Sequence, residues 1–380
     1  MLPMEWFLTM HTRPLAPEDV PSVARMFQRI LRKTSEPATP GLEAYLAQVF
    51  LDGPNHDPHI ASHVHLREDG SVNGFIGAMP LPMVVDDRAV RGAVCGSMMV
   101  EDHEADPFAG ARLMRAFLSG SQDVSLTETA NDISTTMWRK LRGTVLPDHS
   151  LEWVRVIRPA GFVVAAAAAR LQPARALSAL ARPIDALIRR SEASWLHLGA
   201  GMPGNTHASA DMDEGEMVEL LQKLTETFAA RPAWERMNVA RMVADARRKE
   251  NYGGMVRRRV ISRDGRVLGA FLYYGDPGGI GRVVQILFQP GRADIVIDAM
   301  LADANERGLT ALRGRAMPAL LEAMIGRRFM FLHASSSIVH ARDPELIKPF
   351  VSGQAFFNGF AGESWSRLIG DRFDEPTGGD

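Results

Sequence analysis

The sequence has one cysteine, Cys95, in 380 residues, so the chain cannot form an internal disulfide. So little cysteine is typical of proteins from reducing compartments, and the cytoplasm is the expected location. The formal net charge is only −2, which gives no basic surface of the kind that nucleic-acid binding requires. We therefore predict no DNA or RNA partner.

Long apolar runs are also missing. The longest, at residues 162–169, is much shorter than the roughly 20 residues that cross a bilayer, so we expect no membrane span. The first ten residues contain Pro3 and Glu5, where a signal peptide would have basic residues and an unbroken apolar stretch. The sequence therefore predicts that the protein is not exported.

What remains is ordinary globular composition, with 46% hydrophobic and 23% charged residues over a length sufficient for two domains. An alanine- and arginine-rich stretch interrupts the chain after residue 160. We expect an N-terminal domain at 1–160, a helical connector at 161–200 and a second domain at 201–373.

Periodicity and turn signals predict the element order β-α-α-β-β-β-α-β-α-β in the first half. Asp69-Gly70 is a hairpin signal between the strands at residues 60–66 and 72–79. A strand at 90–100 then leads into a helix at 107–118. The other expected elements are a strand at 8–15, helices at 17–31 and 42–51, a strand at 124–129, a helix at 133–141 and a strand at 151–157.

The second half repeats this order, which indicates duplication of one α/β unit. Asp264-Gly265 is again a hairpin signal, and the glycine-rich residues 275–281 join two strands rather than opening a helix, so they do not form a phosphate cradle. The expected helices are at 214–229, 240–248, 294–307 and 318–326, and the expected strands at 255–262, 267–274, 283–288, 309–313, 329–333 and 355–360.

The strand-to-helix turn at residues 95–117 carries a family resemblance. Val100, Gly110 and Leu113 fall in register with the pattern V-x-P-x-x-R/Q-G-x-G-x-G/A-x-x-L. Residues 131–143 also match a segment with an asparagine and a later tyrosine, whose position Trp138 takes. These residues resemble the GNAT superfamily of acyl-CoA-dependent N-acyltransferases. The resemblance implies an α/β (α+β mixed-sheet) fold with two GNAT-like lobes, each a mostly antiparallel mixed sheet flanked by helices.

The turn departs from the family pattern where phosphate would bind. Asp102, Ala105, Asp106 and Phe108 replace a proline, an arginine or glutamine, and two glycines. Asp106-Pro107 is also a good helix start, with an N-cap followed by proline. A carboxylate there would compete for the loop amides and repel phosphate. The loop therefore binds CoA through fewer contacts, binds another acyl donor, or has lost the cofactor.

The resemblance implies a donor site for acetyl-CoA or another acyl-CoA, and no metal. The pantetheine arm of CoA would pair with the strand edge, and the diphosphate would meet the helix start. Acyl transfer to an amine needs a base, for which Glu128 is the first candidate and Glu101 the second, although solvated loop acids are an equally simple explanation. The implied cofactor-binding residues are Met98, Met99, Val100, Phe108, Ala109, Gly110, Ala111 and Asn131.

Three functions stay open. The first is transfer of an acyl group from acyl-CoA to an amine of a small molecule or peptide. The second is a catalytically degenerate GNAT-like binding protein. The third uses acyl carrier protein as donor, docked on the connector arginines, although a solvated connector face explains those arginines more simply. These are Arg175, Arg182, Arg189 and Arg190.

Two further patterns are weaker. Phe288-Gln289-Pro290 imitates the V-x-P of the family pattern in the second half, but no glycine loop follows, which indicates a scaffold or substrate-binding lobe. Four histidines, at positions 56, 59, 63 and 65, suggest zinc, yet alternate residues of one strand share a sheet face without any metal. We predict that they line a sheet face or the acceptor cleft.

Overall fold

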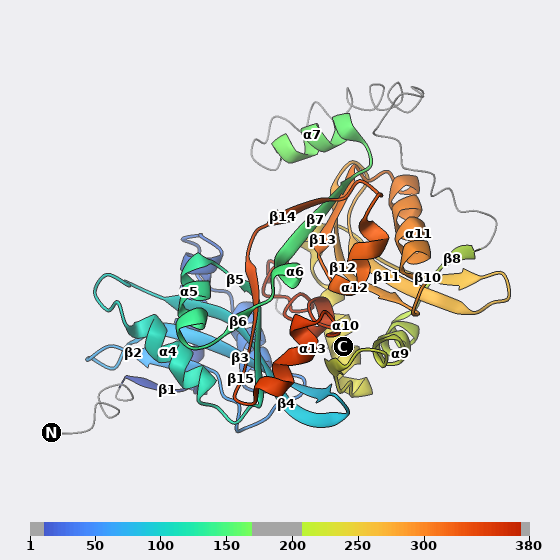
Figure 1. The fold of residues 1–380 in the computed structure, drawn as a ribbon. Helices are drawn as coiled ribbons and strands as arrows, with labels where there is room; N and C mark the ends of the chain where they lie inside the picture. Colours follow the sequence, from blue (N-terminus) through green and yellow to red (C-terminus); the bar gives the residue numbers. More distant parts are fainter. Residues whose placement is uncertain (1–10, 169–206, 374–380) are drawn as a thin grey trace.

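The computed structural model describes residues 11–168 and 207–373, which form two mixed sheets with helices around them (Figure 1). The first sheet has the order β1-β2-β3-β4-β5-β15-β6, with β9 also paired to β3; the second has the order β14-β7-β13-β12-β11-β10-β8. The strands of the first sheet are β1 (Thr12–Pro14), β2 (His63–Leu66), β3 (Val72–Val85), β4 (Arg88–Val100), β5 (Val124–Ala130), β6 (Thr144–Val145), β9 (Ala230–Pro232) and β15 (Ser336–Ala341). Those of the second are β7 (Leu151–Val156), β8 (His207–Asp211), β10 (Met255–Ser262), β11 (Val267–Tyr274), β12 (Ile280–Phe288), β13 (Ala311–Arg315) and β14 (Met330–His333).

Helices follow the sequence signals closely. The helix α9 begins with a capping box between Asp213 and Glu216, and α3 begins after Thr39, whose side chain accepts a hydrogen bond from the Leu42 N–H. The α-helices are α2 (Val20–Met26), α3 (Pro40–Phe50), α4 (Ala109–Leu118), α5 (Asp132–Lys140), α6 (Pro147–Ser150), α7 (Pro159–Ala168), α9 (Glu214–Thr225), α10 (Arg236–Arg247), α11 (Ala293–Glu306), α12 (Pro318–Met324) and α13 (Lys348–Val351). Short 3-10 helices are η1 (Pro17–Asp19), η4 (Glu250–Tyr252), η5 (Pro344–Ile347) and η6 (Gly359–Ala361), and η2 (Phe27–Leu31) is a π-helix that continues α2.

Both sheets contain the same succession of strands. In each, three consecutive strands pair antiparallel, and the third then pairs in parallel with the strand that follows a helix. These groups are β2-β3-β4 with β5 and β10-β11-β12 with β13. Both hairpins turn at a glycine with positive φ, Gly70 and Gly265, as the Asp-Gly signals predict.

The two halves of the chain exchange a strand. β7 lies between β13 and β14 in the second sheet, and β15 lies between β5 and β6 in the first. In Figure 1 the green β7 is therefore seen among orange strands, and the orange-red β15 among blue and teal ones. The sheets thus do not divide at residue 160, because each half completes the sheet of the other.

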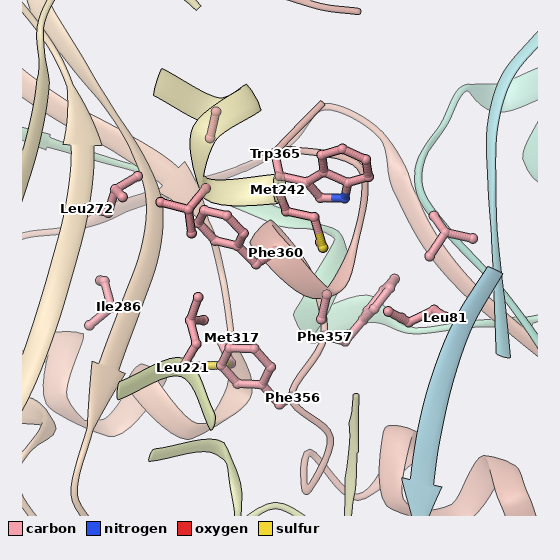
Figure 2. Packing of buried hydrophobic residues seen from close by; sticks show 14 of the residues in the cluster. Leu81, Leu221, Met242, Leu272, Ile286, Met317, Phe356, Phe357, Phe360 and Trp365 are labelled. Atoms are coloured by element: carbon pink, nitrogen blue, oxygen red, sulfur yellow. The ribbon is translucent and has the colours of Figure 1, made fainter. Parts of the chain in front are cut away.

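A continuous apolar core fills the space between the sheets. Figure 2 shows Leu81 of β3, Leu221 of α9 and Leu272 of β11 around side chains from the C-terminal segment, by which we mean residues 355–373. Phe356, Phe357, Phe360 and Trp365 of that segment are all buried there. Burial of this much apolar surface fixes the segment firmly against both sheets.

The predicted strand at residues 355–360 is wrong. That stretch is irregular, because Asn358 and Gly359 adopt φ values of 78° and 66°, which a strand cannot accommodate. The strand that completes the first sheet is instead β15, which was not predicted. The connector arginines lie outside the described residues, as does most of the connector. Within the described ranges, no helix is both long and apolar enough to cross a membrane.

Candidate functional site

The site begins where two parallel strands diverge. β4 and β5 pair only from Gly92–Val124 to Val94–Leu126, and beyond these pairs their facing edges separate. A bulge in β4 accompanies this separation: Ser97 and Met98 together oppose one residue of β3, and Ser97 has a φ of 55°. We call the gap between the two separated edges the splay.

A cavity of about 800 Å³ opens into the splay. The edges of β4 and β5 form one wall, and η2 with the loop that follows it forms the other together with the C-terminal segment. The lining residues lie at 27, 28, 31, 32, 34, 36, 37 and 39, at 95–98, at 127, 129–131 and 134, and at 251, 363, 366 and 368–372. The volume is that of a small-molecule site.

Glu363 places a carboxylate in this cavity. Its Oε1 accepts a hydrogen bond from the Thr129 hydroxyl on β5, and a methyl group built on Gly96 of β4 would lie 3.1 Å from its Oε2. The carboxylate therefore bridges the two edges of the splay. Burial, together with the negative charge of Glu128, raises the pKa of Glu363 to about 7.

Glu128 holds the segment that carries Glu363. Its buried carboxylate accepts hydrogen bonds from the Gly359 N–H at 3.2 Å, the Glu363 N–H at 3.0 Å and the Ser364 hydroxyl at 3.0 Å. Glu128 is not among the residues that line the cavity. The expectation that this side chain faces the cleft is therefore not met, since its oxygens face the C-terminal segment.

A buried lysine lies beside these two acids. Lys249 donates from Nζ to the Ser364 carbonyl at 2.7 Å, and Nζ lies 5.5 Å from the centre of the Tyr252 ring. Burial lowers the pKa of Lys249 to about 8, against the opposing effect of the charges on Glu128 and Glu363. Lys249 in turn holds the pKa of Glu363 below the value it would otherwise reach.

Glu101, the second predicted base, lies outside the cavity. Its two oxygens form ion pairs with Arg29 of η2, at 2.9 Å, and with Arg67 of the first hairpin, at 3.1 Å. Both of its oxygens are thus engaged by arginines, outside the residues that line the cavity. The two ion pairs connect the end of β4 to η2 and to the first hairpin.

Only two of the predicted cofactor-binding residues, Met98 and Asn131, line the cavity. Met98 also reaches the start of α4, because a methyl group built on Gly110 would lie 3.1 Å from its Cε and 3.5 Å from Sδ of Met137. Asn131 caps α5 by accepting the Ser134 N–H at 2.9 Å. The others lie elsewhere: Met99 and Ala109 are buried, Val100 ends β4, and Phe108 and Ala111 are exposed.

The turn between β4 and α4 also differs from expectation. The predicted helix start at Asp106-Pro107 is wrong, since α4 begins at Ala109 and its N-cap, Phe108, makes no side-chain cap. Asp106 instead accepts the Phe108 N–H at 3.1 Å and a hydrogen bond from Arg112 at 2.7 Å. The residues of the splay thus fit a pantetheine arm, whereas this turn does not fit a diphosphate.

Trp138 is a core residue. It is fully buried against Phe117, with ring centres 6.1 Å apart, and its indole N–H finds no hydrogen-bond partner within the part of the chain that the structure describes. The tyrosine position of the family pattern therefore contributes packing to this protein. The Trp138 side chain is therefore not placed to donate a hydrogen bond to an acyl donor bound in the splay.

The histidines do not assemble into a metal centre. His65 is buried on β2, where its Nδ1 lies 2.7 Å from Oδ1 of Asn73. Among the described residues, no group of three or more His, Cys, Asp or Glu side chains is arranged to hold a metal ion.

The corresponding gap in the second sheet is filled. β12 and β13 pair only from Ile280 to Arg282, and residues 358–360 occupy the space beyond. The Phe360 N–H donates to Gln285 at 3.1 Å, and a methyl group on Gly359 would lie 2.5 Å from the Val284 carbonyl oxygen. The chain itself therefore occupies the place that a pantetheine arm would need in this sheet.

Sequence reasoning missed Glu363. The residue follows no recognisable motif, and the stretch before it was predicted as a strand. Its backbone N–H is bound by Glu128, 235 residues earlier in the chain, which is a long-range contact without a local sequence pattern.

Solved structures share this architecture. A conserved protein of unknown function from Enterococcus faecalis, described as a probable N-acyltransferase, matches with a TM-score of 0.57 and 8% identity, over 88% of this chain and 73% of its own. A GCN5-related N-acetyltransferase from Anabaena variabilis has a TM-score of 0.55 and 9% identity, over 88% and 73%. A GCN5-related N-acetyltransferase from Kribbella flavida has a TM-score of 0.51 and 13% identity, over 88% and 71%.

These likenesses concern the fold, because the identities are too low to carry more. No protein-family model matches the chain, and no curated protein matches its sequence. At the level of the fold, the resemblance inferred from the residues around Val100 and Asn131 is confirmed.

Proposed function

Because the chain has the fold of the GCN5-related N-acetyltransferases, we propose that it is an N-acyltransferase that moves an acyl group from a pantetheine thioester to an amine. The observation that carries this proposal is the position of Glu363, a carboxylate with a pKa of about 7 between the separated edges of β4 and β5.

Glu363 acts as the general base. An amine acceptor is protonated near neutral pH and must lose a proton before it attacks a carbonyl carbon. A carboxylate with a pKa near 7 takes that proton more readily than an ordinary exposed glutamate. Its hydrogen bond from Thr129 holds it at the splay, on the side of Gly96 that a side chain would fill.

The two walls of the cavity have different roles. The open backbone edges of β4 and β5 hold the amide-rich pantetheine arm, as an added strand would be held. The bound thioester supplies the activated acyl group. The wall made by residues 27–39 and 366–372 receives the acceptor, and the cavity volume of about 800 Å³ suits a small-molecule amine or the end of a peptide.

Glu128 and Lys249 position and tune the base. Glu128 fixes the backbone on both sides of Gly362, and Lys249 fixes the Ser364 carbonyl. Neither lines the cavity. A thiolate is a tolerable leaving group, so the reaction does not depend on an acid at position 138.

Turnover in the Glu363→Gln variant tests this proposal. Wild-type protein is incubated with acetyl and longer-chain thioesters of pantetheine and CoA and a panel of primary amines, and released thiol is measured. We expect turnover that falls by about 10²–10⁴-fold in the variant, with an unchanged melting temperature. The exposed Glu322 on α12 gives the matched control, Glu322→Gln, which keeps full activity.

Two results would contradict the proposal. One is full activity in Glu363→Gln. The other is thermal stabilisation by pantetheine compounds without turnover of any thioester across the panel, which would favour a catalytically degenerate binding protein.

A further inference from the structure

We infer that Asp106 closes the diphosphate-binding turn from within, so that the donor is recognised by its acylated pantetheine arm and not by a nucleotide. This inference rests on the proposed function and concerns the chemical class of its donor.

Asp106 occupies the turn as an anion would. Its Oδ1 accepts the Phe108 N–H at 3.1 Å, and its Oδ2 accepts from Nη1 of Arg112 at 2.7 Å. Nε2 of His65 lies 3.5 Å from the same Oδ2. A backbone amide, a guanidinium and an imidazole thus converge on one carboxylate of the protein itself.

Three other amides of the turn are also in use. The N–H groups of Ala105 and Asp106 bond to the Asp102 carbonyl at 3.0 and 3.3 Å, and the Ala109 N–H bonds to the Asp106 carbonyl at 3.3 Å. Pro107 has no N–H. A diphosphate that approached the amides of residues 105–109 would therefore have to break bonds that the chain already makes, whereas an ordinary phosphate loop offers free amides.

The acidic residues of the turn also oppose the binding of a diphosphate. Glu101, Asp102, Glu104 and Asp106 place four carboxylates within residues 101–106. The arginine beside Asp106 is paired to it, and both Arg29 and Arg67 are paired to Glu101. The phosphates of CoA would add further negative charge next to these acids, which is unfavourable at close range.

Among the described residues the splay carries a single carboxylate, that of Glu363, which accepts a hydrogen bond from Thr129. The other polar groups along it include the strand edges beyond the last pair of β4 and β5, which suit the two neutral amides of a pantetheine arm. Recognition of the donor therefore relies on the arm. This pantetheine arm occurs as free pantetheine, as part of CoA and attached to acyl carrier proteins. In CoA, the nucleotide contributes little to the binding affinity.

Calorimetry on the wild-type protein is the first test. We expect pantetheine and CoA to bind with dissociation constants within about threefold of each other, because the nucleotide gains no contact at the turn. Binding of CoA more than about tenfold tighter than pantetheine would overturn this inference while leaving the proposed function intact. Failure of both compounds to bind would remove the proposed function, and this inference with it.

The second test removes the internal anion. In Asp106→Ala, the Phe108 N–H and Arg112 are released, so CoA should bind about tenfold more tightly while pantetheine is unchanged. Glu104→Ala removes the same charge from the exposed part of the turn and is the matched control. An equal gain in both variants, or no gain in Asp106→Ala with wild-type melting behaviour, would overturn the role of Asp106.

A third comparison identifies the source of the arm. The wild-type kcat/KM is measured with an acyl-pantetheine and with an acyl carrier protein that bears the same acyl group. If kcat/KM is about tenfold higher with the acyl carrier protein, the natural donor is an arm attached to a protein. Equal values of kcat/KM would indicate that the free acyl-pantetheine suffices. Either result supports recognition through the arm. Reaction with acyl-CoA alone would overturn it.

Discussion

The backbone N–H of Glu363 donates a hydrogen bond to Oε2 of Glu128 at 3.0 Å, so a buried acid of β5 holds the acid that reaches the cavity. The two carboxylates repel each other, which contributes to the raised pKa of Glu363. Glu128 thus both positions Glu363 and contributes to its raised pKa.

Replacing Glu128 by glutamine should destabilise the protein. The buried carboxylate accepts three hydrogen bonds, from Gly359, Glu363 and Ser364, and an amide nitrogen cannot accept its share of them. We expect the free energy of unfolding to fall by about 1–3 kcal/mol, measured by denaturant titration. The matched control is the remote Glu322→Gln, which should leave stability unchanged. A Glu128→Gln variant as stable as wild type would show that these contacts contribute nothing.

The dependence of the rate on pH should report Glu363. Its carboxylate must be ionised to accept a proton, so kcat/KM should rise with pH and level off above an inflection near 7. In Lys249→Met a neighbouring positive charge is lost, which raises the pKa of Glu363 and moves the inflection to higher pH.

The exposed Lys223 gives the control for this shift, since Lys223→Met removes the same charge far from the cavity. An inflection that stays in place in Lys249→Met, or that moves to lower pH, would contradict the assignment of Glu363 as the group that titrates.

Local signals predicted most of the fold. The Asp-Gly turns define both hairpins, and the apolar stripe that buries Leu113, Met114 and Phe117 defines α4. These features depend on residues close together in the chain. By contrast, β15 was missed because its place between β5 and β6 is set by contacts with strands about two hundred residues earlier.

The site was predicted less well, for the same reason. The resemblance around Val100 implied a strand edge that a pantetheine arm could join, and the pairing of β4 with β5 ends at Val94 and Leu126. Glu363, the proposed general base, could not be predicted from residues close to it in the chain. Glu363 reaches the splay through a segment held by Phe356 and Phe360 in the core and by Glu128, which are long-range contacts with no local pattern.

Gly362 should tolerate no side chain. A methyl group at this position would lie 2.2 Å from Oε2 of Glu128, whose three hydrogen bonds prevent it from moving aside. Gly362→Ala should therefore displace Glu363, lower kcat by about tenfold or more, and destabilise the fold by about 1–3 kcal/mol.

The control for Gly362→Ala is Gly254→Ala, at an exposed glycine where the nearest atom would lie 3.9 Å from the added methyl group. This variant should keep wild-type activity. Equal behaviour of the two variants would mean that the contact between Gly362 and Glu128 does not position the base.

The thiol of Cys95 should be nearly inert although it lines the cavity. It is 5% exposed, and burial, together with the charge of Glu363, raises its pKa well above the usual range. Because only the thiolate reacts, titration with a disulfide reagent at pH 8 should show almost no reaction in the folded protein. In denaturant, one thiol per chain should react at once. Rapid reaction of the folded protein would show that the inner end of the splay is open to solvent, and the burial that raises the pKa of Glu363 would then be absent.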